Sequence, residues 1–84
     1  MIFAYMNAVF ASGDPSLIAA ALGDVAEARG MTATAKAAGM SRESLYKALS
    51  SEGNPEFATI MKVMRALGLQ ISITPAEGTG QQAT

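Results

Sequence analysis

The side chains best suited to chemistry lie in one short segment, residues 41–50. At helical spacing they form a polar face made of Ser41, Arg42, Ser44, Tyr46, Lys47 and Ser50. Hydroxyl, guanidinium and ammonium groups hydrogen-bond to phosphate oxygens and to the edges of bases in a DNA groove. This face therefore predicts recognition of nucleic acid, provided that a rigid support presents it.

The residues around this face predict that support. Residues 31–50 favour two short helices joined by a tight turn, in which Thr32 caps the first helix and Ser41 caps the second. The second helix should continue to about Ser50. Gly39 is expected at the corner with a positive φ, which costs glycine almost nothing. Glu43 in the first turn of the second helix suits the positive end of the helix dipole.

The apolar residues of this pair fit a DNA-binding helix-turn-helix. Small Ala35 would let the two helices cross closely, and Leu45 and Ala48 would bury the second helix against the first. Thr34 departs from the pattern at an apolar position, although its methyl group can pack. The alternative is an ordinary helical hairpin with a solvated polar face. The candidate DNA-binding residues are Thr32, Lys36, Ser41, Arg42, Glu43, Ser44, Tyr46, Lys47 and Ser50.

Charge permits this interpretation without requiring it. The net charge of the 84-residue chain is −1, yet five of its six basic residues lie between residues 31 and 74. Phosphate neutralisation depends on the local face, so a nearly neutral protein can bind DNA with a shallow salt dependence. Half of the residues are hydrophobic. This high apolar content in so small a chain suggests that part of its surface is buried against a partner, most simply a second copy of the chain.

Catalytic and metal-binding functions find little support. Ser44 and Lys47 have the Ser-x-x-Lys spacing of serine acyl-enzymes, but no Ser-Asp-Asn or Lys-Thr-Gly motif accompanies them. The chain contains neither histidine nor cysteine, which removes the usual zinc ligands. We predict no catalytic residue, metal, cofactor or small-molecule substrate. The lack of cysteine also fits a cytoplasmic location.

Most of the remaining segments are expected to form helices that support the helix-turn-helix. Residues 1–12 predict an amphipathic helix that presents Ile2, Phe3, Met6, Val9 and Phe10 on one side. It is too short to span a membrane, and no basic residue nearby favours a lipid surface. Asp14 and Pro15 should start a second helix that buries Leu17, Ile18, Ala21, Leu22 and Val25. Pro55 should open a last helix whose apolar residues are Phe57, Ile60, Met61, Met64 and Leu67.

Residues 69–74 switch to a period of two, which predicts a β-strand. Leu69, Ile71 and Ile73 alternate with polar residues, and Pro75 ends the pattern. No other segment reads as a strand, so we expect this one to pair with its own copy across a dimer axis, with these three residues at the interface. Residues 75–84 are expected to form a disordered tail.

Three runs of the sequence resemble a known family. They are Leu-Ile-Ala-Ala-Ala-Leu-Gly-Asp-Val-Ala-Glu-Ala-Arg-Gly-Met-Thr from residue 17, Ser-Arg-Glu-Ser-Leu-Tyr-Lys-Ala-Leu from residue 41, and Gly-Asn-Pro from residue 53. Over residues 2–74 the chain resembles the addiction-module antidote proteins, small bacterial antitoxins with a λ-repressor or Xre-like domain. The resemblance implies binding to operator DNA, repression of the protein's own operon, and a co-encoded toxin similar to the RelE-type ribonucleases. Members usually begin with further N-terminal residues, which this chain lacks.

These observations predict an all-α fold, a λ-repressor-like helix-turn-helix domain of about five helices over residues 1–74, with one short C-terminal strand that pairs across a dimer. The expected function is that of a homodimeric antitoxin and autorepressor, with double-stranded operator DNA and a toxin as partners and no membrane. Two alternatives remain, a stand-alone Xre-like regulator and a protein-interaction module that has lost DNA binding.

Overall fold

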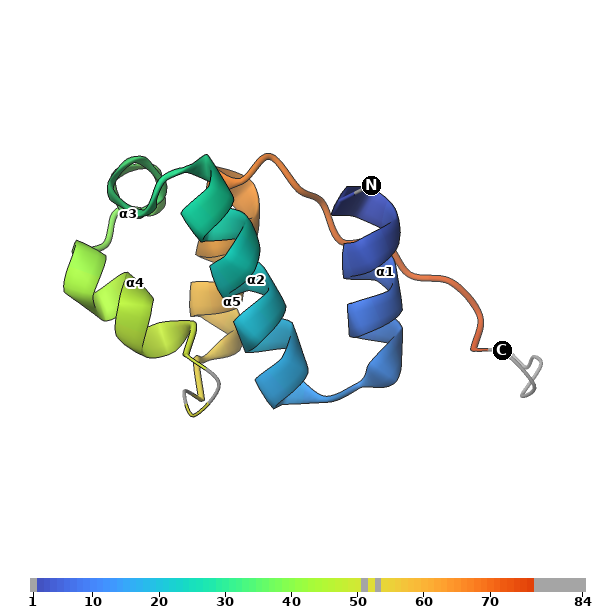
Figure 1. The fold of residues 1–84 in the computed structure, drawn as a ribbon. Helices are drawn as coiled ribbons and strands as arrows, with labels where there is room; N and C mark the ends of the chain where they lie inside the picture. Colours follow the sequence, from blue (N-terminus) through green and yellow to red (C-terminus); the bar gives the residue numbers. More distant parts are fainter. Residues whose placement is uncertain (1, 51, 53, 77–84) are drawn as a thin grey trace.

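The computed structural model describes residues 2–50, 52 and 54–76, and within them the chain is all-helical (Figure 1). Its five helices are α1 (Ile2–Ser12), α2 (Pro15–Arg29), α3 (Met31–Ala38), α4 (Arg42–Ala48) and α5 (Phe57–Ala66). The predicted all-α class and the number of helices are confirmed. The predicted tail lies almost entirely outside the described residues, and only Pro75 and Ala76 of it can be placed, both without regular secondary structure.

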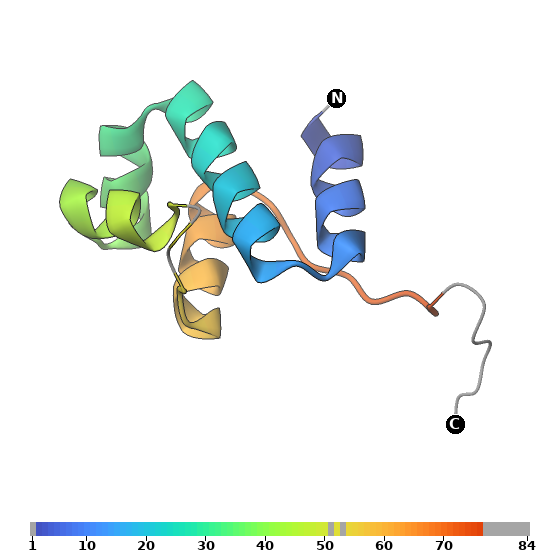
Figure 2. The same cartoon turned by 60° about the horizontal axis from the view of Figure 1, so that its bottom comes forward.

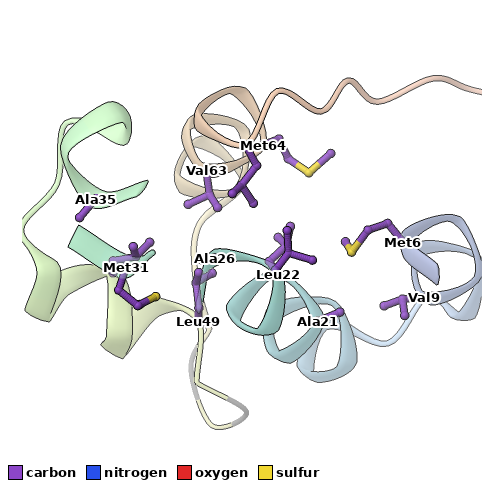
Figure 3. Close-up of a cluster of buried hydrophobic side chains, with 13 residues drawn as sticks. Met6, Val9, Ala21, Leu22, Ala26, Met31, Ala35, Leu49, Val63 and Met64 are labelled. Atoms are coloured by element: carbon purple, nitrogen blue, oxygen red, sulfur yellow. The ribbon is translucent and has the colours of Figure 1, made fainter. Parts of the chain in front are cut away.

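The helices are arranged around α2 and α5, with α1 at one end and α4 at the other (Figures 1 and 2). Helix α3 contacts α2, α4 and α5, whereas α1 contacts α2. One hydrophobic core joins all five helices, and its largest fully buried side chains are Leu22, Leu45, Val63 and Leu67. Met6 and Val9 extend this core into α1, from which they project toward α2 (Figure 3). The core therefore holds α4 in a fixed position at one end of the molecule.

The start of α2 is built as predicted. The Asp14 carboxylate accepts hydrogen bonds from the amides of Ser16, at 3.0 Å, and Leu17, at 3.5 Å. Pro15 occupies the first helical position, where its missing N–H costs nothing. At the other end, the Arg29 guanidinium donates to the Leu67 carbonyl at 3.0 Å. This bond ties the end of α2 to the end of α5.

Gly23 lets α2 approach the end of α4 closely. A Cβ atom at this position would meet the Leu49 carbonyl oxygen at 3.0 Å and the Leu49 Cβ at 3.5 Å. The glycine sits mid-helix, where it costs stability relative to alanine. The close approach gives a physical reason for its presence, since Leu49 packs into the core against α2 only because no side chain stands there.

Three residues predicted for the buried faces are instead exposed. The exposed fraction is 64% for Phe3, 49% for Leu17 and 71% for Phe57. Leu17 and Phe57 lie in the first turns of their helices, beyond the edge of the small core, while Ala19 and Ala26 are fully buried. Small side chains thus occupy the tight contact between helices, which hydrophobicity alone does not reveal. Helix α5 also begins at Phe57 with Glu56 as its N-cap, two residues later than predicted.

The predicted strand does not form in the single chain. Residues 69–76 have no regular secondary structure in the described part of the molecule. A strand requires a ladder partner, and every neighbouring element of this chain is a helix or a turn. Leu69 and Ile71 pack against the core as expected, but Ile73 is 93% exposed. Pairing of this segment with a second copy remains a prediction.

Candidate nucleic-acid interface

The first helix of the candidate interface starts two residues earlier than predicted. Gly30 both ends α2 and precedes α3, with a φ of 107°, and α3 begins at Met31 with no side-chain cap. Thr32 is therefore not the N-cap, and it lies exposed inside the first turn. The chain leaves one residue between the two helices, so a threonine two positions later is already helical. The prediction that Thr32 caps this helix is wrong.

The corner between α3 and α4 has the predicted conformation. Gly39 adopts φ 72° and ψ 31°, in the left-handed region. The amide of Gly39 donates to the Lys36 carbonyl at 3.1 Å, and the amide of Met40 donates to the Ala35 carbonyl at 2.9 Å. The second bond is the six-to-one bond of a Schellman motif, which satisfies a carbonyl at the helix end. The predicted positive φ at Gly39 is confirmed.

Helix α4 is capped and anchored. The Ser41 hydroxyl accepts from the amide of Ser44 at 3.0 Å, which confirms Ser41 as the N-cap, and it donates to the Ser44 hydroxyl at 2.9 Å. Leu45 is completely buried. The helix ends at Ala48 rather than near Ser50, and Leu49 follows it into the core with 4% of its surface exposed. One face of a helix of only two turns is thereby fixed.

Beneath α4, helix α3 presents small buried residues. Ala35 is 3% exposed and Ala38 is 8% exposed. Thr34, the departure from the expected pattern, is also buried at 3% exposure and is the one buried polar side chain among the described residues. Its buried position agrees with a methyl group that packs in place of an apolar side chain. These residues let α3 and α4 pack closely.

All of the predicted DNA-binding residues are exposed, and the structure brings most of them together on the outer side of α4. Their set is Thr32, Lys36, Ser41, Arg42, Glu43, Ser44, Tyr46, Lys47 and Ser50. Thr32 and Lys36 belong to α3, and the others lie on α4 or next to its ends. The face combines three basic side chains with one acidic side chain and several hydroxyls. Side chains of these types can hydrogen-bond to phosphate oxygens and base edges.

Arg42 and Tyr46 form a pair on this face. The guanidinium carbon of Arg42 lies 5.5 Å from the centre of the Tyr46 ring, and Arg42 Nη2 donates to the Tyr46 hydroxyl at 3.4 Å. Four residues separate them, so they are neighbours on one side of the helix. The contact orders a long side chain that would otherwise sample many rotamers. Sequence reasoning missed the pair, although its spacing is a usable signal.

No group of three or more acidic, histidine or cysteine side chains among the described residues could hold a metal ion. None of the described helices is both long and apolar enough to cross a membrane. The polar face of α4 is the candidate site because its hydroxyl, guanidinium and ammonium groups are exposed together on one helix.

Replacement of Gly39 by valine is expected to lower the free energy of unfolding by about 1–3 kcal/mol, because a β-branched residue is strained at a positive φ. Urea denaturation followed by circular dichroism measures the change. Gly39→Asn is the matched control, since asparagine tolerates the left-handed region far better. Equal stability of the valine variant and the wild type would contradict the role given to this corner.

Comparison with known proteins gives a family match over most of the chain. Residues 1–75 match a family model described as "Probable addiction module antidote protein". An uncharacterized protein of Haemophilus influenzae is 55% identical over 69 residues, which cover 82% of this chain and 71% of the relative. No solved structure gives a significant match. The family match spans all five helices and the whole candidate interface, and the chain therefore belongs to the family of probable addiction module antidote proteins.

Proposed function

We propose that this protein is a DNA-binding antitoxin that acts in the cytoplasm as a homodimer, represses its own operon and neutralises a co-encoded RelE-like toxin. The family supports the antitoxin role and a toxin partner in general. The observation that carries the DNA-binding part is the split of α4 into two sides. Leu45 is completely buried on one side, while Arg42, Ser44 and Lys47 are exposed on the other.

This arrangement suits insertion of α4 into the major groove. Helix α4 has seven residues, and the side chains on its outer side are exposed. The major groove of B-DNA is wide enough to admit an α-helix. Arg42 is the candidate for a bidentate contact with guanine, the commonest specific contact to a base. Lys47, Lys36 and the hydroxyls of Ser44 and Ser50 are candidates for phosphate contacts, which position the helix.

The charge of the protein sets how strongly it should depend on salt. Three basic side chains on the candidate face allow only a few phosphate contacts, and the net charge of −1 gives no long-range attraction. Each phosphate neutralised contributes about 0.9 to the slope of log affinity against log salt. A small slope is therefore expected, and most of the discrimination must come from base contacts and from pairing of two half-sites.

The proposal is tested with the promoter upstream of the gene. An electrophoretic mobility shift at low and at physiological salt should show binding to this duplex and much weaker binding to a shuffled duplex of equal length. Equal affinity for both duplexes, or no shift at low salt, would refute sequence-specific binding and leave a protein-interaction module as the function.

The toxin partner is tested separately. Expression of the adjacent open reading frame alone should arrest growth, and co-expression of this protein should restore it. A shift on the promoter without any effect on growth would instead favour a stand-alone transcriptional regulator. The two experiments therefore distinguish the DNA-binding part of the proposal from the antitoxin part.

A further inference from the structure

Helix α1 is apolar on more sides than its own chain covers. Residues 2–13 contain no aspartate, glutamate, lysine or arginine. Met6 and Val9 are buried against the core, yet Phe3 is 64% exposed. Tyr5, whose hydroxyl donates to the Asp24 carboxylate of α2 at 3.5 Å, is still 46% exposed. A helix that is apolar nearly all round is normally covered on both sides. The outer side of α1 therefore has the composition of a contact surface.

A groove runs between α1 and the segment that follows α5. Its volume is about 410 Å³, and its lining includes Phe3, Met6, Phe10, Leu69 and Ile71. Figures 1 and 2 both show this segment passing beside α1, at the end of the molecule away from α4. A partner in the groove would thus leave the outer face of α4 free.

The segment beside the groove has an open backbone edge. Within the described part of the chain, the N–H and C=O groups of residues 70–74 make no hydrogen bond to other backbone groups. Ile73 is 93% exposed, the highest value among the large hydrophobic side chains that are exposed. An unpaired edge next to an apolar groove is a template for an added strand.

The lack of charged side chains on this face favours a second copy of the chain as its occupant. Residues 66–76, like residues 2–13, contain no charged side chain. A two-fold axis brings a surface against its own copy, where any charge near the axis meets a like charge. A face without charges avoids this repulsion. The groove lining contains no charged side chain, so it offers no complement to a strongly charged partner surface.

We propose that α1 and residues 68–73 form the face through which two copies of this chain pair. Residues 68–73 of one copy pair with the same residues of the other copy as antiparallel strands, with Ile71 opposite the partner's Ile71. Side chains alternate along a strand, so this register places Ile73 beside the partner's Leu69, over the partner's groove. The inference deepens the proposed function, because it names the surface that brings two α4 helices to two half-sites.

Analytical ultracentrifugation without DNA tests the proposal with Ile73→Lys and its neighbour Thr74→Lys as the matched control. Ile73 is almost fully exposed in the single chain, so its replacement should leave the thermal unfolding of the monomer unchanged. Loss of a buried isoleucine should raise the dimer dissociation constant at least about tenfold. Thr74 belongs to the opposite side of the strand, and its variant should dimerise like the wild type.

Three results would overturn the proposal: a monomeric wild type at micromolar concentration, an Ile73→Lys variant that dimerises normally, or equal loss of dimer in both variants. A monomeric wild type whose binding to the toxin is lost in Ile73→Lys would assign the face to the toxin instead. The mass is measured without DNA. A monomeric wild type would therefore remove the homodimer from the proposed function, while the promoter shift and the growth rescue would still test DNA binding and toxin neutralisation separately.

Discussion

Replacement of Leu45 by alanine is expected to lower the free energy of unfolding by about 2–5 kcal/mol, because removal of a buried leucine loses its transfer free energy and leaves a cavity. Leu45 is completely buried and belongs to the core cluster that joins all five helices. The surrounding side chains come from separate helices, so the cavity cannot collapse without a shift of the packing. Urea denaturation followed by circular dichroism measures the loss.

Leu17→Ala is the matched control for this prediction. It makes the same substitution at a leucine that is 49% exposed, on a helix whose other apolar residues form the core. Surface substitutions of this kind usually change stability by about 0.5 kcal/mol or less. Equal losses in the two variants would mean that α4 is not held by Leu45 and that another contact fixes the candidate interface.

Much of the fold could be predicted from the sequence because the helix boundaries carry local signals. Asp14 with Pro15, Ser41 and the positive φ of Gly39 each have a mechanism that involves only nearby backbone groups. The prediction that Thr32 caps α3 was wrong because of another local feature. Gly30 already separates α2 from α3, and only one residue is needed there.

Burial was harder to predict because it depends on the whole core. Helical spacing placed Phe3, Leu17 and Phe57 on apolar faces, but a core of this size does not reach these positions. The burial of Ala19 and the approach of Gly23 to Leu49 depend on helices that are distant in sequence. Spacing within one helix cannot reveal which small residue another helix contacts.

The candidate site follows from the sequence in part. The exposed polar face of α4 was predicted residue by residue, because one buried leucine fixes the orientation of so short a helix. Leu49 was missed as the second anchor, although it follows Leu45 by four residues. A strand was predicted for residues 69–74 because apolar and polar residues alternate there. This alternation indicates which side chains share a face, but not which chain supplies the partner strand.

Joint replacement of Arg42 and Lys47 by alanine should abolish the preference for the operator. A bidentate contact of Arg42 with guanine is worth about 1–3 kcal/mol of discrimination, which corresponds to a roughly 5- to 150-fold loss of affinity. Both side chains are exposed, so the double variant should unfold like the wild type. Fluorescence anisotropy on the operator and on a shuffled duplex, each at several salt concentrations, separates the two contributions.

The two single variants assign the roles. Loss of a base contact in Arg42→Ala should reduce affinity for the operator but not for the shuffled duplex. Loss of a phosphate contact in Lys47→Ala should weaken both complexes alike and reduce the salt slope by about one. Tyr46→Phe keeps the aromatic ring 5.5 Å from the Arg42 guanidinium but removes the hydroxyl that Arg42 contacts at 3.4 Å. The Tyr46→Phe variant should therefore retain most of the affinity for the operator. Unchanged operator binding in the Arg42 and Lys47 double variant would mean that α4 does not enter the groove.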